Sequence, residues 1–444
     1  MFRFEKISLY NQASSKIQNE LGIRTVKEKK GRMHWRGLVG VGIMALSILG
    51  VAGCSTQSHQ SPVQQTKSAI KEQAEQVKVN QSTDDKLEVL AKNSQAKLKK
   101  TKSKYNDEVT GKSAPNMTAK LNRALNRKHF VGTALVVKNN KVVFQKGYGY
   151  ADYGLKRKNT AKSLYQINSV QKSLTAILVM KAEQKGLLSL DDKLNKYYPQ
   201  LKNSDQVTLR QMLDMHSGIT GTVSSSKALT EDQMVNYGVK NATVDTKRIG
   251  QWSYAPINYL ILSGILTKVT HQSYYKLYYN TLINPLKLHY SGFMELDNEQ
   301  KTGTKGYGGP LIRDYQNPNT ESPATLDSLL GTGNAYMSDG DLYQAERAVV
   351  TNQIVSQDAA NNLHGVGTDI NYAGGLYRMK DNSGYYSHGV GNYYESTVAI
   401  SPDGKDAVVL MSNYFEKRIM DPVWSTEQTA IDTYKEIHEQ STLN

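Results

Sequence analysis

An apolar segment that opens with a serine and a lysine is the feature that most restricts how this chain can fold. Residues 168–173 read Asn-Ser-Val-Gln-Lys-Ser, and apolar residues are then frequent as far as Gly186. This pattern predicts a largely buried helix that begins at Ser169 and ends at the glycine. Residues three positions apart lie on one face of a helix, so the Lys172 amine can reach the Ser169 hydroxyl. An amine in that place can take the hydroxyl proton and make the serine a nucleophile.

The serine–lysine spacing recurs in the chain, and the surroundings of Ser169 set it apart. Four other serines also have a lysine three residues later: Ser68, Ser94, Ser224 and Ser273. The first two lie in a polar, lysine-rich stretch, the third belongs to a run of serines, and the fourth is a plausible helix N-cap. Ser169 alone among these five opens a long apolar helix. There the positive end of the helix dipole can stabilise developing negative charge.

Strand-like runs in two distant parts of the chain predict one shared sheet. Residues 131–137 and 142–149 are joined at Asn139-Asn140, which indicates a hairpin with a tight turn. Further runs follow at 374–379, 385–388, 394–401 and 407–413, before an amphipathic helix at about 426–439. The middle of the chain is helical and rich in loops. We therefore expect an α/β fold with one antiparallel sheet flanked by helices.

Short motifs spread over residues 117–444 resemble the serine β-lactamase and penicillin-binding protein superfamily, in particular its class C-like branch. They follow the order and spacing of that family: Gly147-Tyr-Gly-Tyr-Ala-Asp152, Ser169-Val-Gln-Lys172, Leu188-Ser-Leu-Asp-Asp192, Val207-Thr-Leu-Arg-Gln-Met-Leu213, His216-Ser-Gly218, Tyr254, Pro285-Leu286, Gly331-Thr-Gly333 before Asp341-Leu342, and His388. The resemblance implies a β-lactamase/transpeptidase-like fold, in which a mainly helical domain lies beside the α/β domain and the active site lies at their junction. It also implies that Ser169 and Lys172 are catalytic.

The same resemblance supplies the other expected site residues. Tyr254 stands where the family has the tyrosine of a Tyr-x-Asn motif, and a phenol there relays protons between the serine and the leaving group. The backbone N–H groups of Ser169 and Gly391 are the expected oxyanion hole. His388 stands in the third motif of the family, and the alternative interpretation is a solvated histidine in a hairpin. The expected substrate-binding residues are His388, Gly389 and Asn258.

Departures from the family pattern bear on the substrate. Pro256 occupies the place of the second-motif Asn, whose amide holds the acyl side chain in penicillin-recognising members. Gly389 lacks the hydroxyl that helps to hold a terminal carboxylate, and Val390 adds bulk where the family has glycine. A D-alanyl ester on a teichoic acid has a free ammonium and no terminal carboxylate. We therefore expect a D-alanyl esterase, with a D,D-carboxypeptidase or related peptidoglycan peptidase as the main alternative and a non-catalytic cell-wall binding or sensing module as another.

The N-terminal part of the chain is expected to export and tether the protein. Residues 37–53 form an uncharged apolar stretch that follows Arg32 and Arg36 and is followed by Cys54, the only cysteine, so the expected signal spans 33–53. This resembles a bacterial lipoprotein signal, in which the Cys54 sulfur carries the lipid; an uncleaved transmembrane anchor is the alternative. Residues 54–116 are polar and basic, which predicts a tether. Residues 1–32 have no evident role, and a true start at Met33 would explain them.

Charge and cysteine content limit the expected partners. The net charge is +15, and most of the excess lies in the leader and the tether, so nucleic acid is not an expected partner. A basic tether suits anionic lipid headgroups and teichoic-acid phosphates, although plain solvation explains it equally well. One cysteine and no HExxH motif leave no basis for a zinc site, and we expect no cofactor. The expected partners are a D-alanine-bearing cell-wall polymer (teichoic acid or peptidoglycan stem peptide) and, through the lipid, the outer face of the cytoplasmic membrane of a Gram-positive-type bacterium.

Overall fold

The computed structural model of the chain describes residues 87–294, 303–309, 315–316, 318–319, 321–368, 370–416 and 426–442. All of them belong to one compact unit, which spans residues 62–444. The unit is mixed α/β, with a seven-stranded antiparallel sheet and helices. This confirms the fold class expected from the sequence.

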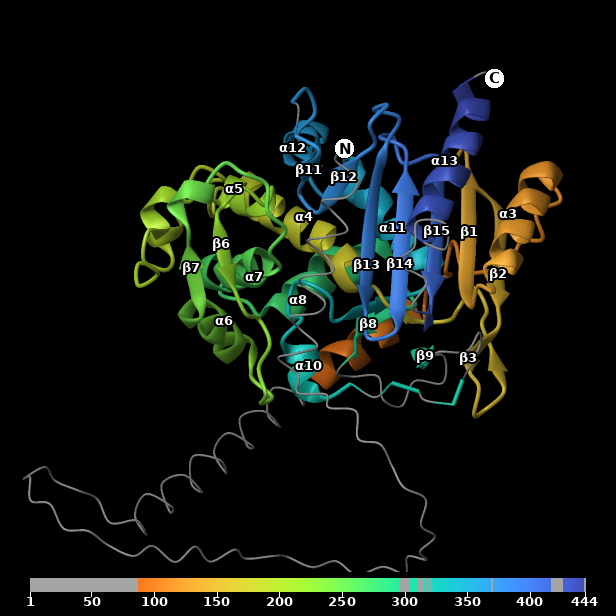
Figure 1. Cartoon of the computed structure of the whole chain (residues 1–444), viewed down its shortest axis with the longest axis horizontal. Helices are drawn as coiled ribbons and strands as arrows, with labels where there is room; N and C mark the ends of the chain where they lie inside the picture. Colours follow the sequence, from red (N-terminus) through yellow and green to blue (C-terminus); the bar gives the residue numbers. More distant parts are fainter. Residues whose placement is uncertain are drawn as a thin grey trace, which may run out of the picture. The chain divides into compact units, whose positions relative to one another are not determined.

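The sheet joins segments that lie far apart in the sequence (Figure 1). Its strand order is β11-β12-β13-β14-β15-β1-β2, so the N-terminal hairpin extends a sheet of C-terminal strands. At the junction Gly132 lies opposite Ser412 and Leu135 lies opposite Val409. Both junction strands are almost wholly buried, as expected where a sheet is covered on both faces. The seven strands are β1 (Gly132–Lys138), β2 (Lys141–Tyr148), β11 (Tyr372–Ala373), β12 (Leu376–Arg378), β13 (Tyr385–Gly391), β14 (Tyr394–Ile400) and β15 (Ala407–Ser412).

Helices cover both faces of this sheet. On one face α3 (Pro115–Arg127) and α13 (Thr426–Thr442) pack over the second largest of the three apolar clusters that the described residues form, and Figure 1 shows α13 crossing in front of the sheet. On the other face α4 (Gln171–Gln184) and α11 (Asp339–Val350) contribute to the largest cluster. α4 is buried on nearly every side, its polar first turn included, and its middle from Ala176 to Met180 is wholly apolar.

A mainly helical region lies beside the sheet (Figure 1). Its central helix, α7 (Ile257–Thr270), contacts α4 as well as α5 (Leu209–Leu213) and α6 (Glu231–Lys240). α5 and α6 each begin with a capping box, in which a threonine hydroxyl and a glutamine side chain accept hydrogen bonds from the first backbone N–H groups. The contact between α7 and α4 brings the loop that precedes α7 to the start of α4.

The remaining described elements are short connecting pieces. The strands among them are β3 (Tyr150–Asp152), β4 (Arg157–Lys158), β5 (Tyr165–Gln166), β6 (Ile219–Gly221), β7 (Ala242–Val244), β8 (Ser291–Phe293), β9 (Tyr307–Gly309), β10 (Ala335–Met337) and β16 (Tyr414–Glu416). The helices and turns are η1 (Asn168–Val170), η2 (Leu194–Lys196), η3 (Ser204–Gln206), η4 (Thr246–Arg248), α8 (Tyr274–Tyr278), η5 (Tyr279–Ile283), α9 (Asn284–Leu286), α10 (Pro323–Asp327) and α12 (Gln357–Leu363).

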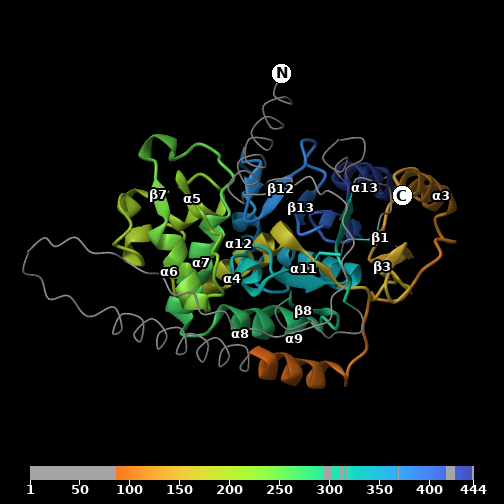
Figure 2. The same ribbon diagram turned by 60° about the horizontal axis from the view of Figure 1, so that its bottom comes forward.

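Part of the expected tether is folded onto the domain, which corrects the boundary expected at residue 117. Residues 87–98 are helical, both terminal leucines of this helix are buried in the largest apolar cluster, and Figure 2 shows the helix alongside α8 and α9. Ser94 donates a hydrogen bond to Asn284 Oδ1 at 2.6 Å. Tyr105 is also buried. The polar composition of the segment did not indicate this docking, because the docking depends on only a few buried apolar residues.

The described part of the chain offers no membrane-spanning helix, since none of its helices is both long and apolar enough. Nor do these residues include a group of three or more His, Cys, Asp or Glu side chains that could hold a metal ion. The leader at 1–32, the expected signal at 33–53 and Cys54 lie outside the described residues. They stay predictions.

Candidate active site

Ser169 lies in η1, one turn of 3₁₀ helix that leads directly into α4. The preceding residue, Asn168, has a left-handed backbone with φ 49°, a conformation that asparagine tolerates better than most residues. Asn168 Nδ2 donates a hydrogen bond to the Gly391 carbonyl at 3.1 Å, which fixes the turn against β13. The strained turn therefore holds Ser169 at the N-terminus of a buried helix, the position expected from the sequence.

The structure brings Ser169, Lys172 and Tyr254 together. Lys172 Nζ and the Tyr254 hydroxyl each lie 2.8 Å from Ser169 Oγ. The lysine is buried, with 1% of its surface exposed, and Nζ lies 5.1 Å from the centre of the Tyr254 ring. Nζ also contacts the Thr332 carbonyl at 3.5 Å. The three groups can pass a proton among themselves, as an acyl-transfer centre requires; their catalytic roles remain a prediction.

The loop before α7 presents Tyr254 to the nucleophile. Ser253 N donates a hydrogen bond to the Met215 carbonyl at 2.8 Å, which ties the loop to the turn that follows α5. The Tyr254 ring contacts the Tyr372 ring edge-on, and Trp252 contacts the same ring. Tyr254 is 38% exposed. Its hydroxyl therefore reaches Ser169 from the solvent side, whereas Lys172 approaches from the core.

Strand β13 borders the nucleophile through Gly389. A Cβ built at Gly389 would lie 2.3 Å from the Ile167 carbonyl oxygen and 2.7 Å from Ser169 N. Backbone therefore packs against backbone here, and a side chain at this position would push the strand away from the nucleophile turn. The sequence motif pointed to Gly389 as a substrate-binding residue. The structure explains why the residue is glycine, and substrate contact at Gly389 stays a prediction.

The register of the β13–β14 hairpin moves the expected oxyanion donor by one residue. The strands are joined by Asn392 and Tyr393, whose φ angles of 53° and 64° are typical of a type I′ turn. The flanking pair, Gly391 and Tyr394, then exchanges hydrogen bonds, and the direction of bonding alternates along the strand. The Gly391 N–H therefore points to Tyr394. The Val390 N–H points to the other edge, where β12 no longer pairs with β13, so Val390 replaces Gly391 as the candidate donor.

His388 lies on the opposite face of the sheet from Ser169, because neighbouring residues on a strand alternate in direction. Its Nε2 lies 2.9 Å from Glu395 Oε1, and its Nδ1 lies 3.3 Å from Glu427 Oε2 on α13. Burial acts to lower the pKa of His388, but the hydrogen bond and charge of Glu395 and the charge of Glu427 outweigh it, and the pKa is raised. The Val390 side chain points to the same face by the same alternation. Neither side chain borders the nucleophile, which corrects the expected roles of both.

Asn258 also differs from its expected role as a substrate-binding residue. It is 1% exposed, on the first turn of α7. Its Oδ1 accepts a hydrogen bond from the Ser217 hydroxyl at 2.7 Å, and its Nδ2 donates to the Ala255 carbonyl at 3.0 Å. The amide therefore holds the Tyr254 loop in place from inside the protein. Pro256 stands at the N-cap of α7, where it supplies no amide group to the cleft.

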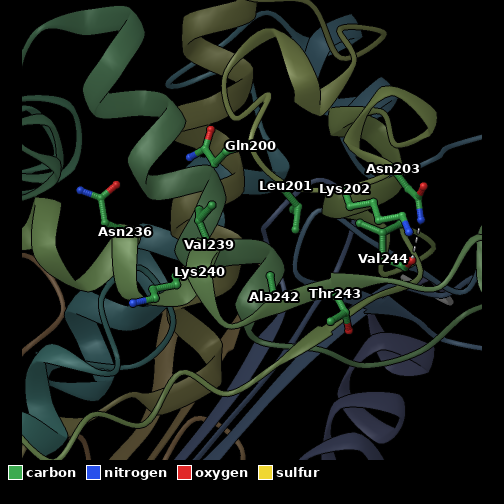
Figure 3. A pocket seen from close by; sticks show the side chains of 10 residues that line it. All are labelled: Gln200, Leu201, Lys202, Asn203, Asn236, Val239, Lys240, Ala242, Thr243 and Val244. Atoms are coloured by element: carbon green, nitrogen blue, oxygen red, sulfur yellow. Dashed lines mark hydrogen bonds between the residues drawn. The ribbon is translucent and has the colours of Figure 1, made fainter. Parts of the chain in front are cut away.

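A cavity of about 570 Å³ lies in the helical region (Figure 3). Its walls come from the segment around Leu201, from α6 and from β7, and two lysines, Lys202 and Lys240, stand at it. Ser169, Lys172 and Tyr254 are not among the residues that line it. The cavity is therefore separate from the candidate active site.

Comparison with known protein families decides the family question. The sequence model of the family described as Beta-lactamase matches residues 117–424, which is more than half of the chain. The chain belongs to the β-lactamase family. This family consists in general of serine hydrolases, and the match confirms the resemblance drawn from the motifs.

Relatives within this family carry names with different activities. Teichoic acid D-alanine hydrolase of Staphylococcus aureus (strain MRSA252) is 30% identical over 252 residues, which cover 56% of this chain and 62% of that protein. PbpX of Bacillus subtilis (strain 168) is 26% identical over 400 residues, or 88% of this chain and 93% of that protein. The match to the hydrolase thus spans less than two thirds of its length.

Solved structures of the β-lactamase family show the same fold. The crystal structure of FmtA from Staphylococcus aureus matches with a TM-score of 0.65 and 26% identity, over 77% of this chain and 93% of that chain. D-amino acid amidase from Ochrobactrum anthropi SV3 matches with a TM-score of 0.59 and 18% identity, over 73% and 99%. At that identity the amidase supports the fold alone.

Proposed function

We propose that the protein is an extracytoplasmic serine esterase that removes D-alanine from teichoic acids through an acyl-enzyme on Ser169. The observation that carries the reaction type is the contact of Ser169 Oγ with both Lys172 Nζ and the Tyr254 hydroxyl at 2.8 Å. A nucleophile flanked by two groups that can accept or return its proton suits acyl transfer in both directions. A binding or sensing module would not need this arrangement.

The reaction that fits this geometry has two halves. In the first, Ser169 Oγ attacks the ester carbonyl carbon, and the hydroxyl proton passes to Lys172. The carbonyl oxygen takes the negative charge and is held by the N–H groups of Ser169 and Val390. The ester C–O bond then breaks, and the polymer hydroxyl leaves with a proton delivered through Tyr254. In the second half, water attacks the D-alanyl ester on Ser169, its proton follows the same route, and D-alanine leaves.

The substrate class rests on what the cleft lacks. Pro256 replaces the amide that would hold an acyl side chain, and the Asn258 amide is already bound inside the protein. On β13, Gly389 has no hydroxyl, and the hydroxyl of Ser387 is buried. A substrate with an acyl amide and a terminal carboxylate would leave both ends without these partners. A D-alanyl ester requires neither, because it ends in a free ammonium.

The relative named teichoic acid D-alanine hydrolase supports this choice, at 30% identity over part of both chains. PbpX matches over a larger share of this chain. Its name is that of a penicillin-binding protein. Our second candidate is a D,D-carboxypeptidase acting on stem peptides, and the same assay distinguishes the two.

The test uses two substrates in parallel. The purified full-length chain is incubated with D-alanylated teichoic acid and, separately, with a muropeptide that ends in D-Ala-D-Ala, and released D-alanine is measured. We expect release from the teichoic acid, little from the muropeptide, and none from either with Ser169→Ala. The reverse order of rates would identify the carboxypeptidase.

We further propose that lipid on Cys54 places the enzyme at the outer face of the cytoplasmic membrane, next to this polymer. The support is the apolar segment 33–53 that ends at this cysteine. Cys54→Ala should abolish cleavage of the leader and labelling with a radioactive fatty acid. Unchanged processing of the variant would instead favour a spanning helix.

A further inference from the structure

A buried carboxyl group lies directly behind the proposed nucleophile. Glu346 on α11 is 0% exposed, and its Oε1 lies 2.6 Å from the Ser173 hydroxyl on α4. Ser173 follows Lys172 in the chain. The Ser387 hydroxyl on β13 also acts to lower the pKa of the Glu346 carboxyl, although Ser387 Oγ and Glu346 Oε2 are both buried without a hydrogen-bond partner in the structure. The carboxyl thus lies near both the helix that carries the nucleophile and the strand that borders it.

The hydrogen bonds of Ser173 indicate that Glu346 carries a proton. The Ser173 hydroxyl lies 2.8 Å from the Val170 carbonyl as well as 2.6 Å from Glu346 Oε1. A hydroxyl has one proton to donate, and a carbonyl can only accept. If Ser173 donates to Val170, the bond to Glu346 needs its proton from the carboxyl. Ser387 Oγ and Glu346 Oε2 have no partner in the structure, and a hydrogen bond from Ser387 to this second carboxyl oxygen would pair both without a buried charge.

The position of these contacts relates them to the reaction. Ser173 lies one residue after Lys172, and Ser387 lies two residues before Gly389, whose Cα packs against the Ser169 amide. A change in the distance between α4 and β13 would therefore move Ser169 relative to the Val390 N–H. Small displacements of this kind strongly reduce catalysis, because reacting groups must meet at close to contact distance.

We propose that Glu346 is a positioning residue that acts in its protonated form, linking Ser173 on α4 to Ser387 on β13 and so keeping Ser169 in register with the oxyanion strand. The inference depends on the proposed function only in that Ser169 is the nucleophile. It does not depend on the identity of the substrate.

The electrostatics of the site agree with this role. Burial raises the pKa of Glu346 to about 8, although the hydroxyls of Ser173 and Ser387 stabilise the carboxylate. Above that pH the carboxyl loses the proton that it donates to Ser173. Ser173 must then turn to the carboxylate and give up its hydrogen bond to the Val170 carbonyl, with a new negative charge buried beside α4. We therefore expect the reactivity of Ser169 to fall as the pH rises through about 8.

Other titratable groups near Glu346 do not account for a change at that pH. Burial raises the pKa of Tyr278 on α8 well above its usual range. Burial lowers the pKa of His364, which contacts the Val349 carbonyl of α11, to about 4. On β13, burial raises the pKa of Tyr385. Lys172 on α4 is retained in every variant below, so a difference between variants reports on Glu346.

The test measures how fast a fluorophosphonate probe labels Ser169 in the full-length chain between pH 6 and 9.5. Glu346→Gln keeps a neutral group that can donate to Ser173 and accept from Ser387. We expect it to label within about twofold of the wild-type rate at pH 7 and to lose the fall near pH 8. Glu346→Ala breaks both contacts and should label about tenfold more slowly at pH 7, a loss of roughly 1.4 kcal/mol.

Asp339→Asn is the matched control. Asp339 is a second fully buried carboxyl on α11, with a pKa raised by burial to about 7, but its partner is Gln145 on β2, at 2.7 Å. Its labelling profile should keep the wild-type shape. The proposal is wrong if Glu346→Gln keeps the alkaline fall, if Glu346→Ala labels at the wild-type rate, or if Asp339→Asn also removes the fall. Normal labelling without D-alanine release would instead contradict the proposed substrate alone.

Discussion

The Cα of Gly389 lies against the backbone amide of Ser169, so close that a Cβ on the glycine would come within 2.7 Å of the Ser169 nitrogen. This contact sets the distance between the nucleophile turn and strand β13. The hairpin register directs the Val390 N–H to the side of β13 where β12 no longer pairs with it. The oxyanion hole that we propose depends on this spacing.

Gly389→Ala should therefore impair acylation far more than it impairs folding. The added methyl group would press on the Ile167 carbonyl and the Ser169 amide, and misplacement of a reacting group by about 1 Å costs on the order of a hundredfold in rate. Labelling of Ser169 by a fluorophosphonate measures the effect. Gly186→Ala is the control: its Cβ would meet nothing within 4 Å, although its φ of +69° also disfavours a side chain. Equal labelling by the two variants would contradict the close contact.

Tyr254→Phe should lower turnover by roughly a hundredfold or more, because it removes the hydroxyl that lies 2.8 Å from Ser169 Oγ and relays protons. The expected loss is in kcat, with little change in thermal stability, since Tyr254 is partly exposed. Tyr237→Phe is the control. It removes another exposed tyrosine hydroxyl, which donates a hydrogen bond to the Ser224 carbonyl and not to Ser169, and it should leave turnover unchanged. If both variants keep wild-type turnover, Tyr254 is not part of the catalytic centre.

The sequence predicted the catalytic geometry better than it predicted the binding edge. Ser169 and Lys172 are one helical turn apart, so a local rule was enough to bring them together. The position of Tyr254 required the family motif, because its loop reaches Ser169 through the long-range contact of α7 with α4. Motif spacing alone did not reveal which way each residue of β13 faces. The pairing register shows it: His388 faces away from Ser169, and Val390 replaces Gly391 as the candidate oxyanion donor.

The same distinction applies to the fold. Alternation and turn residues were enough to predict the hairpin that contains β1 and β2 and the C-terminal strands. The docking of residues 87–98 was missed, because only a few leucines in a polar segment carry it and their partners lie elsewhere in the chain. Glu346 was missed for a similar reason. Nothing in the local sequence of α11 separates a buried glutamate from an exposed one.

Thermal stability should fall as the pH rises from 6 to 8.5. Burial raises the pKa of Glu346 to about 8, of Asp339 to about 7 and of Asp341 to about 6. The folded state therefore holds these protons more tightly than the unfolded state, and this stabilisation is lost as the pH rises through the folded values. His364 acts in the opposite direction, because burial lowers its pKa to about 4, so it offsets part of the carboxyl contribution as the pH drops from about 6.5 towards 4.

Melting temperatures measured across this pH range test the sign. We expect a decrease of several degrees between pH 6 and 8.5, and a smaller decrease in Glu346→Gln, which removes one of the titrating groups. A melting temperature that rises over this interval would show that these carboxyls ionise freely in the folded protein.

Penicillin should acylate Ser169 slowly or not at all, despite the family. The cleft has Pro256 in place of the motif amide and no exposed hydroxyl beside Gly389, and each missing hydrogen bond costs roughly 1–3 kcal/mol. Two such losses correspond to about a hundredfold or more in rate. The measurement is the ratio of acylation rates for a labelled penicillin and a D-alanyl ester. Rapid, stoichiometric penicillin labelling with little ester turnover would favour the carboxypeptidase.

The central claim is that Ser169 carries a D-alanyl group during turnover. The most direct measurement incubates the full-length chain with D-alanylated teichoic acid, quenches with acid within the first turnovers and analyses the peptides by mass spectrometry. Our account predicts a D-alanyl adduct on the peptide that contains Ser169, absent from Ser169→Ala and more abundant when deacylation is slowed. D-alanine release without an adduct on this serine, or with an adduct on another residue, would contradict it.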